Sequence, residues 1–65
     1  MLTVNDVLAQ TNATWFMIVS GKTRYTYVDE TARDVVAHCF GCCNVKRVVG
    51  FGGNFQNAQS IKIEI

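Results

Sequence analysis

Two short segments rich in aromatic and β-branched residues constrain this fold more than any other feature of the sequence. Residues 15–20 (WFMIVS) and 23–28 (TRYTYV) are joined only by Gly21-Lys22. Glycine at the first of two turn positions suits a type II′ turn, so the pattern predicts a β-hairpin whose register is fixed by the turn. Opposite side chains share a face, which gives one face with Phe16, Ile18, Tyr25 and Tyr27 and another with Trp15, Met17, Val19, Arg24, Thr26 and Val28. Both faces are therefore largely apolar.

Two helices are predicted from cap motifs and apolar spacing. A threonine stands three residues before an aspartate at Thr3–Asp6 and again at Thr31–Asp34, where the hydroxyl can accept the backbone N–H three residues on. The first helix is expected over residues 4–10. The second is expected to run from residue 32 to Gly41 or just past Cys43, with Asn44 in a left-handed turn. Its apolar stripe consists of Ala32, Val35, Val36, Cys39, Phe40 and Cys43.

Two further strands are predicted over residues 45–51 and 60–65, with a polar loop between them. In the last segment Ile61, Ile63 and Ile65 alternate with Lys62 and Glu64. The expected fold is therefore α+β, in the order αββαββ, with one mostly antiparallel four-stranded sheet and two helices on one face. We expect a single domain over residues 1–65, and the sequence leaves the order of the strands open.

A chain of 65 residues with 49% hydrophobic and 17% charged residues is too apolar to be disordered and too short to cover both faces of the hairpin. Uncovered apolar patches are usually interaction sites. We therefore expect a homo-oligomer, a dimer or higher, with Trp15, Met17 and Val19 at the interface. Such a homo-oligomer could form either by sheet-on-sheet packing or by strand addition at a sheet edge. The alternative is a monomer whose loops and first helix cover both faces.

A glycine-rich segment is the candidate site for an anion, because Gly52, Gly53 and Asn54 can turn backbone N–H groups toward a phosphate. The spacing matches neither the dinucleotide-binding nor the P-loop pattern, so a bulge followed by a turn is the competing interpretation. Aromatic and basic residues of the β segments complete a candidate site in which a base stacks while a cation holds phosphate. These residues are Arg24, Tyr25, Tyr27, Lys46, Arg47 and Phe51. The alternative is that the aromatic residues belong to the core.

Metal binding and catalysis are not predicted. His38 lies near Cys39, Cys42 and Cys43, but adjacent cysteines on a helix diverge and the sequence has no second ligand pair. Zinc shared between subunits stays open, and Cys39 and Cys43 are expected to be buried thiols. With one histidine and no evident pair of carboxylates, we expect no catalytic residues, no cofactor and no enzyme activity.

Cellular location is predicted from the cysteines and the apolar runs. Three cysteines within five positions favour reduced thiols in a cytoplasm. The sequence has no signal-peptide pattern, and its longest apolar run is too short to span a membrane.

The opening Leu2-Thr3-Val4-Asn5-Asp6-Val7-Leu8 and the closing Ile61-Lys62-Ile63-Glu64-Ile65, with a hairpin and a helix between them, resemble very short proteins of phages and integrated elements of Gram-positive bacteria. The resemblance covers the element order over nearly the full chain and assigns no functional residue. It implies a host-facing inhibitor in the host cytoplasm, because proteins of this type include anti-CRISPR proteins and oligomeric sponges for immune signalling nucleotides.

Together these features predict a non-catalytic, homo-oligomeric phage accessory protein that antagonises bacterial defence by sequestering a nucleotide-type signal. Two alternatives stay open. One is an anti-CRISPR-like inhibitor that binds a host defence protein through Trp15 and Met17. The other is a weak binder of single-stranded nucleic acid, for which a net charge of +1 gives little support.

Overall fold

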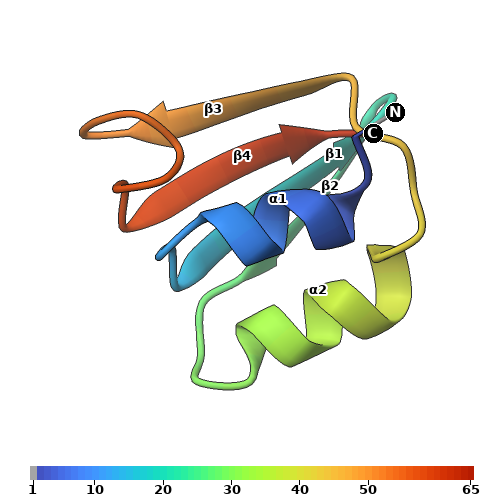
Figure 1. Cartoon of the computed structure of the whole chain (residues 1–65). Coiled ribbons are helices and arrows are strands. Elements are labelled where there is room, and N and C mark those ends of the chain that lie inside the picture. The colour runs from blue at the N-terminus through green and yellow to red at the C-terminus, as the bar shows by residue number, and fades with distance from the viewer. Residues whose placement is uncertain (1) are drawn as a thin grey trace.

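The structure is a computed structural model that describes residues 2–65, and it is of the expected α+β class. The helices are α1 (Val4–Gln10) and α2 (Ala32–Phe40), and the strands are β1 (Trp15–Ser20), β2 (Thr23–Tyr27), β3 (Arg47–Phe51) and β4 (Ser60–Glu64). In Figure 1, α1 lies in front of β1 and β2, and α2 lies below α1. Within residues 2–65, neither helix has the length and apolar character needed to cross a bilayer.

The four strands form one sheet in the order β2-β1-β4-β3. The hairpin is antiparallel in the predicted register, with Ile18 opposite Tyr25, and β3 pairs antiparallel with β4. In the centre of the sheet, however, β1 and β4 run parallel. The sheet is therefore mixed, and the expectation of a mostly antiparallel sheet is corrected. The physical reason is the long return of the chain through α2 and β3, which allows β4 to enter beside β1 in the same direction.

The hydrophobic core lies between the helices and one face of the sheet. Phe16 and Ile18 of β1 and Ile61 and Ile63 of β4 are each at most 1% exposed. They point to the same side because alternate residues of a strand share a face. Burying one such side chain contributes about 1.5–3 kcal/mol, so the two central strands supply much of the core energy. The other buried apolar residues are Val4, Val7, Leu8, Ala13, Ala32, Val36 and Ala58.

The two predicted helix caps differ in outcome. At α1 the Thr3 hydroxyl accepts the Asp6 N–H at 3.3 Å, and the Asp6 carboxylate accepts the Thr3 N–H at 2.9 Å, so the predicted cap is confirmed. At α2 the predicted cap is wrong. The Thr31 hydroxyl instead donates to the Asp29 carboxylate at 2.8 Å, because an aspartate two residues earlier competes for it.

Helix α2 ends at Phe40 with Gly41 as its C-cap, which confirms the shorter of the two predicted ends. The two helices meet at this glycine. Gly41 lies against α1, where an added Cβ would sit 2.6 Å from Asn5 Oδ1, and its carbonyl accepts the Asn5 N–H at 3.0 Å. The predicted stripe consequently breaks. Cys39 is exposed and Cys43 is half-buried, so the expectation of a buried Cys39 thiol is wrong.

The turns use glycine where the backbone requires it. Gly21 has φ +60°, the positive value that the first position of the predicted hairpin turn needs. The expected left-handed Asn44 is wrong, since positive φ within residues 2–65 is confined to Gly21 and Gly52. Asn44 instead forms an isolated antiparallel bridge with Thr3, which keeps its backbone extended.

Candidate functional site

The sheet face turned away from the helices carries the candidate site. Strand alternation and register place on it Arg24 and Thr26 of β2, Trp15, Met17 and Val19 of β1, Ser60, Lys62 and Glu64 of β4, and Arg47, Val49 and Phe51 of β3. We call these eleven residues the open face. Trp15 is 56% exposed and Phe51 is 49% exposed, so two large aromatic side chains meet solvent on it.

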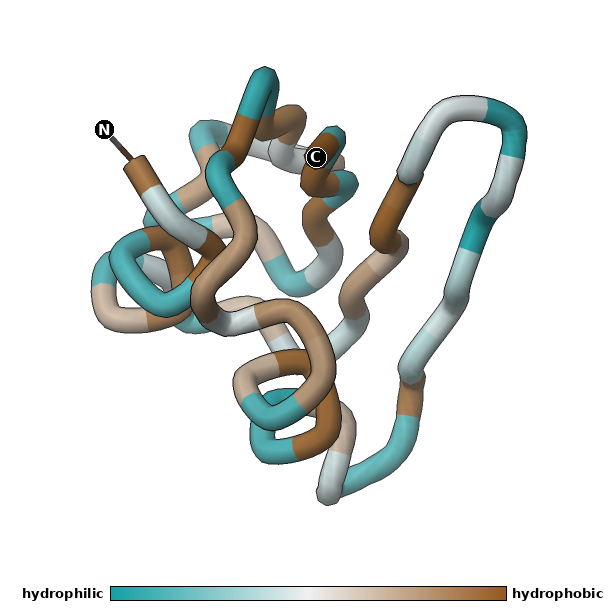
Figure 2. The backbone as a smooth tube through the Cα atoms, turned by 90° about the vertical axis from the view of Figure 1, so that its right-hand side faces the viewer, coloured by the Kyte–Doolittle hydropathy of each residue, from teal (hydrophilic) through white to brown (hydrophobic). Residues whose placement is uncertain are grey.

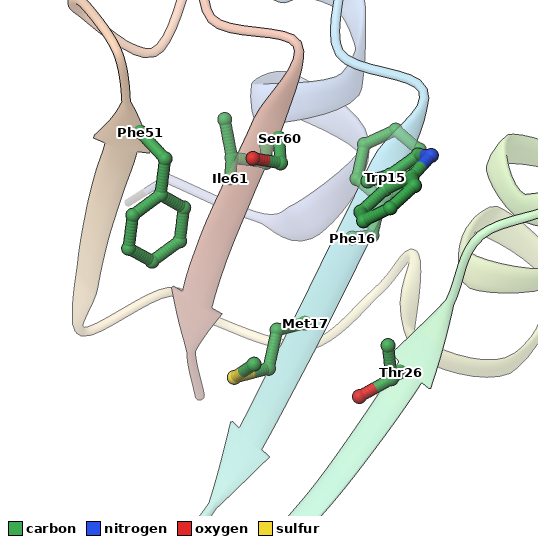
Figure 3. A pocket seen from close by; sticks show the side chains of 7 residues that line it. All are labelled: Trp15, Phe16, Met17, Thr26, Phe51, Ser60 and Ile61. Carbon is green, nitrogen blue, oxygen red and sulfur yellow. The ribbon is translucent and has the colours of Figure 1, made fainter.

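A hollow lies between the two aromatic side chains. Ser60 pairs with Trp15 across one strand boundary and with Phe51 across the next. Neighbouring strands are about 4.8 Å apart, which places the two aromatic Cα atoms roughly 10 Å from each other. Because the residue between them is small, a hollow of about 120 Å³ opens over Ser60, with Met17 and Thr26 also at its wall (Figure 3). Enclosed small-molecule pockets hold about 300 Å³ or more, so this one accepts a single ring system.

A second hollow is also lined by Trp15. It measures about 380 Å³, is more polar, and is lined by Thr14, Trp15, Gln59 and Ser60. Trp15 and Ser60 therefore border both hollows. A ligand with a flat apolar part and a polar part could contact Trp15 and Ser60 from both hollows.

The open face carries more positive than negative charge. Its charged residues are the cations Arg24, Lys62 and Arg47 and the carboxylate Glu64. Arg47 Nε lies 3.8 Å from Glu64 Oε2, a buried oxygen with no hydrogen-bond partner among residues 2–65. Since this ion pair partly offsets Arg47, Arg24 and Lys62 are the cations best placed to attract an anion.

The structure separates the residues predicted to bind a ligand. Tyr25 and Tyr27 point to the helix side, where their rings lie 5.4 and 6.2 Å from the ring of Phe40. Arg24, Arg47 and Phe51 share the open face, although Arg24 lies at the opposite edge of the sheet from the other two. Lys46 is exposed just before β3. The exposed aromatic side chains of the open face are therefore Phe51 and Trp15, and the two tyrosines lie on the other face.

The Gly52-Gly53-Asn54 segment forms a folded turn. It covers Gly50, where an added Cβ would lie 2.8 Å from the Gly53 carbonyl oxygen. The Asn54 carbonyl accepts the Asn57 N–H at 3.1 Å, and the Asn54 side chain accepts the same N–H at 3.2 Å. Gly52 supplies a φ of +86°. These contacts favour a turn over a phosphate cradle, and the one-to-one register of β3 with β4 up to Phe51 contains no bulge.

Five residues of the open face were not among the predicted site residues: Thr26, Val49, Ser60, Lys62 and Glu64. The alternation of residues 61–65 does turn Lys62 away from the core. What the sequence does not give is the insertion of β4 between β1 and β3, and only that insertion brings Ser60 between Trp15 and Phe51.

The cysteine cluster, Cys39, Cys42 and Cys43 with His38, does not have the geometry of a metal site. Cys39, Cys42 and His38 are exposed, and Cys43 is half-buried. Within the part of the chain that the structure describes, no three His, Cys, Asp or Glu side chains gather closely enough to hold a metal ion.

Comparisons with protein-family models, with curated proteins and with solved structures gave no match. The chemistry of the open face is accordingly inferred from its geometry and charge.

Proposed function

We propose that this protein is a non-catalytic binding protein that sequesters a nucleotide-type ligand on its open face. The base would enter the hollow between Trp15 and Phe51, and the phosphate would lie toward Lys62 and Arg24. The observation that carries the proposal is the presence of two exposed aromatic side chains and an excess of cations on one sheet face. Stacking on an aromatic side chain contributes about 1–3 kcal/mol per base, and the cations attract the phosphate.

Two ligands would present a base and a phosphate to this face: a free nucleotide, and an unstacked nucleotide within a single strand. The hollow of about 120 Å³ accepts one ring system, and the open face offers three cations, one of them paired with Glu64. Both features favour the free nucleotide. The further idea that this nucleotide is a bacterial defence signal comes from the resemblance to phage proteins alone.

Intrinsic tryptophan fluorescence can detect ligand binding at the hollow, because Trp15 is the only tryptophan of the chain. A base stacked on the indole should quench its fluorescence in a saturable way. We expect quenching by cyclic and linear nucleotides and none by ribose 5-phosphate, which lacks the base. Absence of quenching by every nucleotide at millimolar concentration would contradict the proposal. Quenching by a short oligonucleotide, measured in parallel, distinguishes a free nucleotide from a nucleotide within a single strand.

A matched pair of variants tests the location of the site. Ser60→Phe fills the hollow and should abolish quenching, whereas Ser20→Phe adds the same ring at an exposed position at the end of β1, away from the hollow, and should leave the affinity unchanged. Phe51→Ala should weaken binding roughly tenfold through the loss of one stacking surface. Equal binding by both serine variants would place the ligand elsewhere.

A protein partner is the second candidate, favoured by the exposure of Trp15, because tryptophan is enriched at the centres of protein interfaces. A folded partner would cover the whole open face, including Val49, whereas a nucleotide needs only the hollow. Val49→Ser should therefore weaken a protein complex and leave nucleotide quenching intact.

A further inference from the structure

Strand β2 is an edge strand whose outer backbone groups belong to Arg24 and Thr26. The two-residue turn makes Ser20 and Thr23 a hydrogen-bonded pair, so Tyr25 and Tyr27 also bond to β1, and the alternate residues Arg24 and Thr26 direct N–H and C=O outward. The other side of β1 agrees with this alternation, since the carbonyl of its odd-numbered Val19 accepts the Ile65 N–H at 2.9 Å. Figure 2 shows this segment, in pale and teal colours, along the outer margin of the molecule.

This edge has few of the features that normally prevent strand pairing. Proteins protect edges with prolines, bulges, charges or a covering segment. The chain has no proline, and β2 carries one charge in five residues, Arg24, among threonines and tyrosines. Residues 23–26 are all exposed, and Tyr25 is 41% exposed.

We propose that two copies of this chain pair through β2, antiparallel, about a two-fold axis at Tyr25. Arg24 then lies opposite Thr26 of the partner subunit, and each such pair exchanges two backbone hydrogen bonds. Like charges stay apart, because Arg24 never faces its own copy. On the helix side the exposed ring of Tyr25 packs against Tyr25 of the partner subunit in a non-hydrogen-bonded pair, where opposite side chains approach most closely. Pairing an edge with itself closes as a dimer, whereas pairing β2 with β3 would propagate into a filament.

Edge pairing replaces the interface that the sequence predicted at Trp15, Met17 and Val19. Face-to-face packing would bring the three cations of each copy together, and the single carboxylate on each face is already paired with Arg47. Pairing through β2 avoids this repulsion and leaves the open face accessible.

The dimer also completes the ligand site, a consequence that rests on the proposed function. Thr26 lines the hollow, and the partner subunit's Arg24 lies directly opposite it on the same face of the joined sheet. Each hollow thus gains a cation from the second copy, on the side of the hollow away from Phe51.

The dimer is tested by sedimentation equilibrium and amide hydrogen exchange on the wild-type chain. We expect twice the chain mass, with the Arg24 and Thr26 amides protected and losing protection on dilution. Thr26→Pro removes an outward N–H without touching the β1 ladder and should give a monomer, whereas Thr26→Val keeps the N–H and should stay dimeric. A monomeric wild type at millimolar concentration, or a dimer with unprotected Arg24 and Thr26 amides, would overturn the proposal.

A variant on the helix side separates the dimer from the ligand site. Tyr25→Lys places two like charges at the axis, away from the open face, and should give a monomer that binds nucleotide several-fold more weakly because the partner subunit's Arg24 is lost. Tyr25→Phe should behave as wild type. A wild-type dimer that binds no nucleotide would contradict the proposed function only, and a wild-type monomer that binds nucleotide would contradict edge pairing only.

Discussion

At the scale of single residues, Arg33 of α2 joins α2 to the end of α1 through its side chain. Its guanidinium donates to the Leu8 carbonyl, to the Thr11 carbonyl at 2.8 Å and to the Ala13 carbonyl at 3.1 Å. It also lies 5.6 Å from the centre of the Phe16 ring. Carbonyls at the end of a helix lack partners within the helix, so Arg33 of α2 satisfies the end of α1 and fixes the approach to β1.

Replacing this guanidinium should therefore destabilise the fold even when the charge is kept. Arg33→Lys cannot donate to three carbonyls in a fork, and we expect the free energy of unfolding to fall by about 2 kcal/mol. Urea denaturation measures the change. Arg24→Lys is the control, since the same substitution at an exposed position should stay within about 0.5 kcal/mol. Equal stability of the two variants would show that Arg33 is not a structural clamp.

The cap of α1 makes stability depend on acid pH. The Thr3 backbone N–H, and secondarily the Thr3 side chain, hold the pKa of Asp6 below its ordinary value of 3.8. A carboxyl whose pKa is lower when folded stabilises the protein above the unfolded value and loses this contribution as pH falls through the folded value.

Asp6→Asn should accordingly be less stable than wild type near neutral pH, with the difference shrinking as the pH is lowered below 3.8. Thermal unfolding of the two proteins over this range measures it. Thr3→Ala should cost about 1 kcal/mol through loss of the cap. A difference that stays constant at every pH would mean that the Asp6 carboxylate does not act through its charge.

At the scale of elements, local patterns predict well and long-range contacts do not. The hairpin register depends on two adjacent segments and one glycine, and it is as predicted, although β2 ends at Tyr27, one residue earlier than expected. Helix α1 depends on its own cap and has the predicted bounds. For α2 the sequence left two ends open, and the structure has the one at Gly41, where that residue contacts Asn5, 36 positions away in the sequence. The candidate site was predictable only where it depends on local strand patterns. Trp15 and Phe51 stand in evident strands, while Ser60 joins them only through the strand order.

Gly50 in β3 and Gly53 in the loop after it form a matched pair for testing how tightly this loop packs on β3. At Gly50 an added Cβ would lie 2.8 Å from backbone atoms of the loop, whereas at Gly53 it would meet no atom within 4 Å. Gly50→Ala should lower stability by about 1–3 kcal/mol, because backbone must move to make room. Gly53→Ala should stay within about 0.5 kcal/mol. Since Gly50 precedes Phe51, only the first variant should also weaken nucleotide quenching, and equal effects of the two would contradict the tight loop.

At the scale of the whole molecule, charge is distributed unevenly between the two sides of the sheet. The chain has a net charge of +1, yet the open face alone holds three cations and one carboxylate. The carboxylates of Asp29 and Glu30 lie in the segment between β2 and α2, and that of Asp34 in the first turn of α2, so none of the three belongs to a strand of the open face. A small excess of positive charge is thus concentrated where the aromatic side chains are exposed, which favours a flat anion over a long polyanion.

Salt dependence separates these two ligands quantitatively. A single strand that contacted all three cations would show a slope near −2 in log K against log salt, because each phosphate contact contributes about −0.7. Its affinity would then fall roughly twentyfold between about 50 and about 200 mM salt. A free nucleotide has no condensed counterions along a backbone to release, so we expect its affinity to fall only a few-fold over the same range. Trp15 quenching by a mononucleotide and by an oligonucleotide at several salt concentrations measures both slopes. A slope markedly steeper than −2 would show that more cations contact the ligand than the open face of one chain provides.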